Sequence, residues 1–151
     1  MARVDVSASR AIAAPPALVY GIIADYHVGH PSILPAKWFG PLSVVEGGVG
    51  AGTRIRFSMK GMGPERPMEA VVAEPQPGRV LTETYPATGG VTTFTVEPEA
   101  AGSRVTFHTT WETRGIAGFL ERLAAPGFLR RVYKDELDQL QILAEAKALA
   151  G

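Results

Sequence analysis

Two histidines lie close to an aspartate in a pattern that suggests metal binding or general-base catalysis. Asp25, His27 and His30 fall within one short stretch of the chain. Imidazole and carboxylate groups are common zinc ligands, and an imidazole can also exchange a proton near neutral pH. No His-Glu-x-x-His pattern supplies further ligands, and the surrounding residues include several glycines and prolines. We therefore expect both histidines in exposed loops, Asp25 as the cap of a short helix, and no bound metal.

Glu83 and Tyr85 are further candidates for acid–base chemistry. In a strand over residues 79–85 they share one face with Leu81, because side chains two residues apart point the same way. A carboxyl group buried on that face would have a raised pKa and could act as an acid or a base. The alternative is an outward Glu83 that pairs across strands with a basic residue, and we favour this arrangement.

His108 and Glu112 share a face of a predicted strand over 103–113 and could form a base oriented by a carboxylate. The opposite face carries Val105, Phe107, Thr109 and Trp111. Because this second row is the more apolar, we expect it to point inward and the row with His108 to face solvent. The candidate catalytic residues are thus Glu83, Tyr85 and His108, and they form no complete catalytic set.

Other catalytic motifs are missing from the sequence. It contains no Gly-x-Ser-x-Gly nucleophile elbow and no Gly-x-x-x-x-Gly-Lys-Ser/Thr phosphate loop. The glycine-rich run from Gly48 to Gly52 precedes a predicted strand, so no helix N-terminus follows it to bind a phosphate. We predict a hairpin turn at this run.

The elements that must position these residues are mainly β-strands. Residues 4–12 alternate between apolar and polar types, which predicts a strand buried on one face. Further strands are predicted at 41–47, 53–60, 67–74, 79–85, 91–97 and 103–113. Clusters of Gly and Pro separate them, and such short connections join antiparallel neighbours. Residues 16–24 have helical spacing after Pro15, and Asp25 begins a second short helix.

The C-terminal part of the chain changes to helical spacing. One helical pattern begins at Phe119 and is interrupted at Pro126 and the glycine after it. A longer helix follows over 127–149, roughly 35 Å in length, with one apolar stripe. The stripe consists of Leu129, Val132, Tyr133, Leu137, Leu140, Leu143 and Ala144. We expect Glu136 to lie largely off this stripe, which must pack against the inner face of the sheet.

Inward residues of the strands and of this helix are the candidate lining of an interior space. They are Phe57, Met59, Met68, Phe94, Phe107, Thr109, Trp111, Tyr133 and Leu137. Apolar side chains at such spacing usually fill a packed core, so a filled interior is the alternative to an open cavity.

Composition excludes several classes of function. The 151 residues suit one domain spanning 1–151, and 15 basic residues balance 15 acidic ones, which argues against nucleic-acid binding. The absence of cysteine excludes disulfides and Cys-ligated metals. No apolar run approaches the roughly 20 residues of a membrane span, and the N-terminus lacks the apolar block of a signal peptide. We expect a cytoplasmic protein.

Four short motifs occur in an order and spacing that resemble one known superfamily. They are Ile12–Tyr20 with Asp25, Gly50–Arg54, Glu74–Leu81 and Gly102–Thr106. The chain resembles the START-like, or Bet v 1-like, SRPBCC superfamily, and within it the polyketide cyclase/dehydrase-like proteins. It departs from that pattern where Trp38 follows Pro35, since the family often has an aromatic residue between the two prolines after the first helices.

The resemblance implies an α+β helix-grip fold. In this fold a curved antiparallel sheet of about seven strands surrounds a long C-terminal helix, and two short helices follow the first strand. The family uses the pocket between sheet and helix for lipids, polyketides or other hydrophobic molecules, and no cofactor is implied. Binding of a small hydrophobic ligand is therefore our first hypothesis. A polyketide cyclase or aromatase acting through an acid or base is the alternative, and a co-chaperone-like interaction domain is the third.

Overall fold

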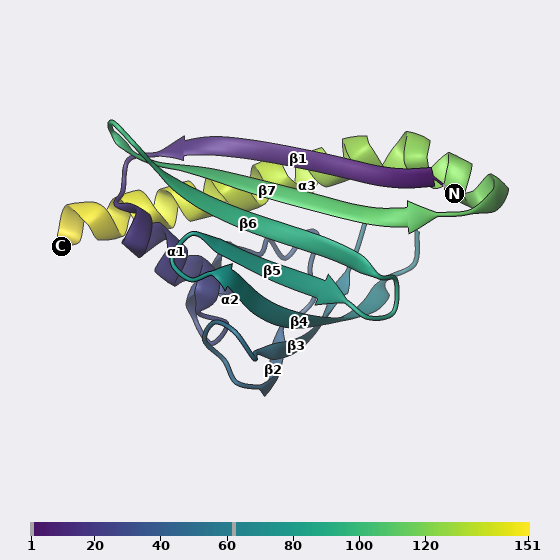
Figure 1. The fold of residues 1–151 in the computed structure, drawn as a ribbon, viewed down its shortest axis with the longest axis horizontal. Coiled ribbons are helices and arrows are strands. Elements are labelled where there is room, and N and C mark those ends of the chain that lie inside the picture. Colours follow the sequence, from purple (N-terminus) through teal and green to yellow (C-terminus); the bar gives the residue numbers. More distant parts are fainter. Residues whose placement is uncertain (1, 62) are drawn as a thin grey trace.

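A computed structural model describes residues 2–61 and 63–151 of the chain (Figure 1). In chain order the elements are β1 (Ala2–Ile12), α1 (Pro16–Ala24), α2 (Gly29–Ile33), β2 (Ser43–Glu46), β3 (Arg54–Met59), β4 (Arg66–Gln76), β5 (Val80–Tyr85), β6 (Gly90–Glu99), β7 (Gly102–Thr113) and α3 (Gly115–Ala150). This order confirms the predicted α+β helix-grip fold, including the two short helices after the first strand.

The strands form one antiparallel sheet in the order β1-β7-β6-β5-β4-β3-β2. Strands β2 to β7 form the predicted meander, and β1 completes the sheet by pairing with β7 along its whole length, from Ala2 opposite Thr113 to Ile12 opposite Ser103. The sheet curves, and α3 runs along its concave side (Figure 1). The concave face of the sheet therefore faces α3.

The inner face of the sheet is the apolar face that alternation predicts. In β7, Val105 and Phe107 are completely buried, whereas Thr106 and His108 are partly exposed, which confirms the predicted orientation of this strand. On the helix side, Val132 and Leu140 are also completely buried. The core thus follows from period two in the sheet and period 3.6 in the helix.

The predicted interruption at Pro126 and Gly127 is wrong, because α3 continues through both residues as one helix of 36 residues. A proline inside a helix removes one backbone N–H donor and crowds the preceding turn. Here Ala125, Phe128 and Leu129, which flank the proline, are buried in the core. Their packing holds both halves of the helix along one direction.

The two short helices lie where the sequence predicts them. Pro16 occupies the first turn of α1, where its missing N–H costs nothing. The Asp25 carboxylate accepts hydrogen bonds from the backbone N–H groups of His27 and Gly29, at 3.0 and 3.3 Å, in the turn before α2. The prediction that Asp25 begins and caps this helix is wrong, because α2 begins at Gly29 and its N-cap residue is Val28, which makes no side-chain hydrogen bond. Among the described residues, no helix is both long and apolar enough to cross a membrane.

Candidate ligand cavity

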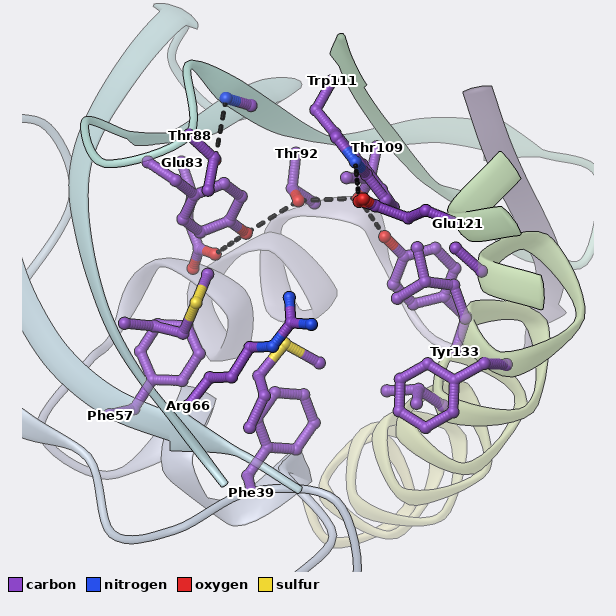
Figure 2. Close-up of a pocket in the computed structure, with 18 of the residues that line it drawn as sticks. Phe39, Phe57, Arg66, Glu83, Thr88, Thr92, Thr109, Trp111, Glu121 and Tyr133 are labelled. Atoms are coloured by element: carbon purple, nitrogen blue, oxygen red, sulfur yellow. Dashed lines mark hydrogen bonds between the residues drawn. The ribbon is translucent and has the colours of Figure 1, made fainter. Parts of the chain in front are cut away.

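A cavity of about 820 Å³ lies between the concave face of the sheet and α3 (Figure 2). Its lining comes from strands β3 to β7, from the segment between α2 and β2, and from the first two-thirds of α3. Much of the wall is apolar, and aromatic rings such as Phe39 and Phe57 project into it (Figure 2). A tightly packed core contains few voids larger than a water molecule, so this interior is an open cavity and not a filled core.

Seven of the nine residues expected at an interior space do line the cavity. They are Phe57, Met59, Met68, Phe94, Thr109, Trp111 and Tyr133. Phe107 and Leu137 instead belong to the packed core and are almost completely buried. The Phe107 ring meets the Phe94 and Tyr133 rings edge-on, at centroid distances of 4.8 and 5.9 Å, so it supports the wall from behind.

Glu83 points inward, and the favoured prediction of an outward side chain paired with a basic residue is wrong. Its side chain is buried with Leu81 on the inner face of β5 and borders the cavity. Its carboxylate accepts hydrogen bonds from the hydroxyl groups of Tyr26, at 2.6 Å, and Tyr85, at 2.9 Å. These two charge-assisted bonds offset the cost of removing the carboxylate from water.

His30 is buried beside Glu83, so the prediction that both histidines are exposed is wrong for this residue. Its Nδ1 lies 2.8 Å from the carbonyl oxygen of Ile23. A carbonyl only accepts, so Nδ1 carries a proton and Nε2 faces the Glu83 carboxylate at 3.6 Å. The His30 ring stacks on Tyr26 with centroids 4.4 Å apart. His27 remains exposed, as predicted.

Asp25 and the two histidines do not form a metal site. His27 and His30 differ in burial, and the Asp25 carboxylate is occupied by backbone N–H groups. In residues 2–61 and 63–151, no group of three or more His, Cys, Asp and Glu side chains could hold a metal ion.

A chain of hydroxyl groups connects Glu83 to α3 across the cavity wall (Figure 2). Tyr85 and Thr92 are 2.7 Å apart, as are Thr92 and Thr109, and Thr109 is hydrogen-bonded to Tyr133. Each hydroxyl has one proton, and Tyr85 donates its proton to the carboxylate. It follows that Thr92 donates to Tyr85, Thr109 to Thr92, and Tyr133 to Thr109.

Burial alters the protonation of the groups around the cavity. Desolvation, reinforced by the charge of Glu83, raises the pKa of Tyr26 and of Tyr85 well above the usual value, and desolvation also raises the pKa of Tyr133. All three phenols thus remain hydrogen-bond donors at neutral pH.

Glu136 is a second buried carboxyl group on the cavity wall. Only 4% of the residue is exposed, and it lies on α3 three residues after Tyr133. Desolvation first, and then the charge of Glu83, raises the pKa of Glu136 well above its usual range. The expectation that Glu136 lies off the apolar stripe is wrong. Glu136 is three residues after Tyr133 and four before Leu140, and residues at these spacings share one face of a helix. This spacing could have predicted that Glu136 is buried.

The cavity lining also includes charged residues. Lys60, Arg66, Glu112 and Glu121 all border the cavity, so both signs of charge are present. Trp111 donates a hydrogen bond from Nε1 to Glu121 at 3.0 Å and thereby joins the end of β7 to α3 (Figure 2).

His108 lies on the outer face of the sheet, as expected for its row. Its Nε2 is 2.7 Å from the carboxylate of Asp5 on β1. The carboxylate that orients it is thus on the neighbouring strand, and Glu112 borders the cavity instead. Glu83 and Tyr85 are brought together inside the molecule, and His108 is separated from them by the sheet.

The curved sheet, the long helix and the cavity between them define a helix-grip protein of the START-like, Bet v 1-like class. The chain belongs to the family described as polyketide cyclase / dehydrase and lipid transport, whose pattern matches residues 3–145.

Solved structures support this assignment. The KanY protein (ms6282) is 32% identical with a TM-score of 0.83, and the match covers 96% of this chain and 99% of that one. TTHA0849 from Thermus thermophilus is 27% identical with a TM-score of 0.72, over 95% and 99% of the two chains. Ara h 8.0201 shares the fold at 15% identity and a TM-score of 0.63, over 99% and 100%. No curated protein matches the chain significantly.

Proposed function

We propose that the chain binds a small hydrophobic molecule in the cavity between the sheet and α3. The observation that carries this proposal is the cavity itself, with a volume of about 820 Å³, an extensive apolar lining and a row of polar groups on one wall. Ligand sites in proteins commonly have volumes of about 300–1,000 Å³ and few but well-placed polar groups. The family description, which includes lipid transport, supports the same function.

A test of this proposal is binding of the uncharged fluorescent probe N-phenyl-1-naphthylamine to the wild type and two variants. Met68 on β4 lines the cavity, whereas Val71 on the same strand is exposed to solvent. The variant Met68→Trp should weaken probe binding by roughly tenfold or more, because overlap with a bulky ring costs at least about 1.4 kcal/mol. The matched variant Val71→Trp should bind as the wild type does.

Two results would overturn the proposal. One is a wild-type protein that does not bind the probe. The other is a folded Met68→Trp variant, with an unchanged melting temperature, that binds the probe as tightly as Val71→Trp does.

A second candidate function is acid–base catalysis of the polyketide cyclase type, and one observation favours it. Glu83 and His30 both border the cavity, with the carboxylate 3.6 Å from Nε2, so two buried groups that can accept a proton lie side by side next to a ligand. In this function the Glu83 carboxylate would take a proton from an activated carbon of a poly-β-ketone, and the C–H electron pair would pass to the neighbouring carbonyl group as an enolate.

The variant Glu83→Gln separates the two functions. With a short poly-β-ketone thioester as substrate, an enzyme should lose nearly all cyclisation in Glu83→Gln while still binding the fluorescent probe. Equal product formation in the wild type, in Glu83→Gln and without protein would reject catalysis and leave binding as the function.

A further inference from the structure

Glu136 lacks a hydrogen-bond partner, unlike the polar side chains of the hydroxyl chain on the same cavity wall. Glu83, Tyr85, Thr92, Thr109 and Tyr133 all have hydrogen-bond partners within the protein. Within the described part of the chain, the Glu136 carboxyl has neither a hydrogen-bond nor an ion-pair partner, although the residue is only 4% exposed. Among the described residues no completely buried side-chain oxygen lacks a partner, so the unpartnered oxygens of Glu136 retain some accessible surface beside the cavity. A carboxyl group that is largely removed from water and has no protein partner costs free energy, and a ligand that bonds to it would recover that cost.

The hydroxyl chain determines what the rest of this wall can offer a ligand. Every proton of the chain is donated towards Glu83, from Tyr133 through Thr109 and Thr92 to Tyr85. The hydroxyl groups can therefore present only lone pairs to the cavity. A ligand that meets this wall needs a donor of its own.

Glu136 complements the chain at its helical end. It lies on the same face of α3 as Tyr133, because residues three apart on a helix are neighbours. Burial and the charge of Glu83 favour the uncharged acid form of Glu136, which both donates and accepts a hydrogen bond. A ligand hydroxyl also donates and accepts, and so matches this group in both directions.

We propose that Glu136 is the polar anchor of the cavity and selects uncharged hydrophobic molecules that carry a hydroxyl group, namely phenols and alcohols. This inference rests on the proposed binding function and adds the class of ligand. A carboxylate ligand would be disfavoured, because the charge of Glu83, which lies on the same cavity wall as Glu136, would repel it. An ether can accept a hydrogen bond from the Glu136 proton but leaves the Glu136 carbonyl oxygen without a donor. A pure hydrocarbon leaves both groups without a partner.

The test uses four naphthalene derivatives of similar size, measured by displacement of N-phenyl-1-naphthylamine. They are 2-naphthol, 2-methoxynaphthalene, 2-naphthoate and 2-naphthylmethylamine. The wild type should bind 2-naphthol about tenfold more tightly than 2-methoxynaphthalene, because the site holds buried groups that the ether cannot satisfy. The carboxylate and the ammonium compound should bind more weakly than 2-naphthol.

Three variants assign the selectivity to Glu136. Glu136→Leu should remove the preference for 2-naphthol and leave the affinity for 2-methoxynaphthalene equal or improved. Glu136→Gln should retain most of the preference, since an amide also donates and accepts. Met68→Leu, which changes only apolar lining, should keep the full preference. If Glu136→Leu does not fold, Glu136→Met provides the same comparison.

The outcomes that would overturn each proposal are distinguishable. If none of the four compounds and no fluorescent probe binds the wild type, the proposed binding function fails. If the compounds bind with equal affinity, or if Glu136→Leu keeps the preference for 2-naphthol, only the anchor is rejected. Tighter binding of the ammonium compound would reject the uncharged ligand class and show Glu136 acting as an anion.

Discussion

Two glutamates face one cavity, and their neighbours give them different properties. Glu83 receives hydroxyl protons from Tyr26 and Tyr85 and lies beside His30. Glu136 lies in the same wall with no such donors among the described residues. The missing donors and the charge of Glu83 both favour the acid form of Glu136, whose pKa is raised well above its usual range.

The raised pKa of Glu136 makes the stability of the protein depend on pH. The folded state holds this proton more tightly than the unfolded chain, in which the carboxyl has its usual value of about 4.5. Stability therefore falls as pH rises above that value, because the unfolded state releases the proton more readily.

The variant Glu136→Gln removes this titration. We expect it to match the wild type in free energy of unfolding near pH 4 and to exceed it near pH 8, as measured by urea denaturation. The control is Glu97→Gln, since Glu97 is an exposed residue of β6. A wild type that is no less stable than Glu136→Gln at the higher pH would contradict this account.

Alternation in the sequence predicts which face each residue occupies, but not which charged residues are buried. It correctly places Glu83 on the same face as Leu81, and Leu81 is completely buried. The general preference of charged groups for the surface led to the opposite orientation. The partners that make burial possible are Tyr26 and His30, which lie far from Glu83 in sequence, so only the tertiary structure reveals them.

The two short helices position half of the Glu83 site. Tyr26 and His30 lie in α2 and the turn before it, and α2 packs against α1 at Gly29. A Cβ atom at Gly29 would lie 2.5 Å from the backbone oxygen of Ile22. Because that neighbour is backbone, a larger side chain must displace one helix relative to the other.

The variant Gly29→Ala should therefore be destabilised by roughly 1–3 kcal/mol and should alter the environment of His30. Urea denaturation measures the first effect, and the His30 ring resonances in NMR spectra measure the second. Gly21→Ala in α1 is the matched control, because a Cβ there meets nothing within 4 Å and alanine favours a helix by about 1 kcal/mol. Similar stabilities for the two variants would show that the close contact does not constrain α2.

Strand and helix boundaries follow closely from the sequence where glycine and proline mark turns, as at Gly102 between β6 and β7. A Cβ at this position would meet the backbone oxygen of Ile12 at 2.4 Å, and φ is 145°. The same reasoning gives the wrong result at Pro126, where α3 continues. Proline indicates a local cost in free energy for a helix. Only the burial of Phe128 and Leu129 in the tertiary structure shows that packing offsets this cost.

Pro126 should make the first part of α3 the least stable part of that helix. Residues 115–125 lie before the proline, and Ile116, Leu120 and Leu123 there are largely exposed. Proline disfavours a helix interior by about 3 kcal/mol relative to alanine. The variant Pro126→Ala should slow amide hydrogen exchange across 115–125 by roughly tenfold or more, with little change in β1. Exchange as fast as in the wild type would show that the proline does not limit this segment.

Different strands of the sheet support the fold and line the cavity. β1 pairs with β7 along its full length and packs against α3, yet none of its side chains lines the cavity within the part of the chain that the structure describes. The lining comes from β3 to β7 and from α3. Occupation of the cavity would therefore connect strands from the middle and far edge of the sheet to the first part of the helix.

A bound ligand should consequently stabilise the entire fold and protect one side of it most. At a free ligand concentration one hundred times Kd, binding adds about 2.7 kcal/mol, which for a chain of this size raises the melting temperature by roughly 5–10 °C. We expect 2-naphthol to produce this rise in the wild type. Amide exchange should slow most in β3, β5 and the first half of α3, and least in β1.

The variant Met68→Trp provides the control for this effect, because a smaller cavity should reduce the rise in melting temperature by about half or more and weaken the local protection. The distribution of protection distinguishes cavity binding from attachment elsewhere. A ligand held on the exposed side chains of α3 would slow exchange in the helix and leave β5 unchanged, since β5 reaches the ligand only through Glu83 and Tyr85 on the cavity wall. Protection of β5 that disappears in Met68→Trp would place the ligand between sheet and helix.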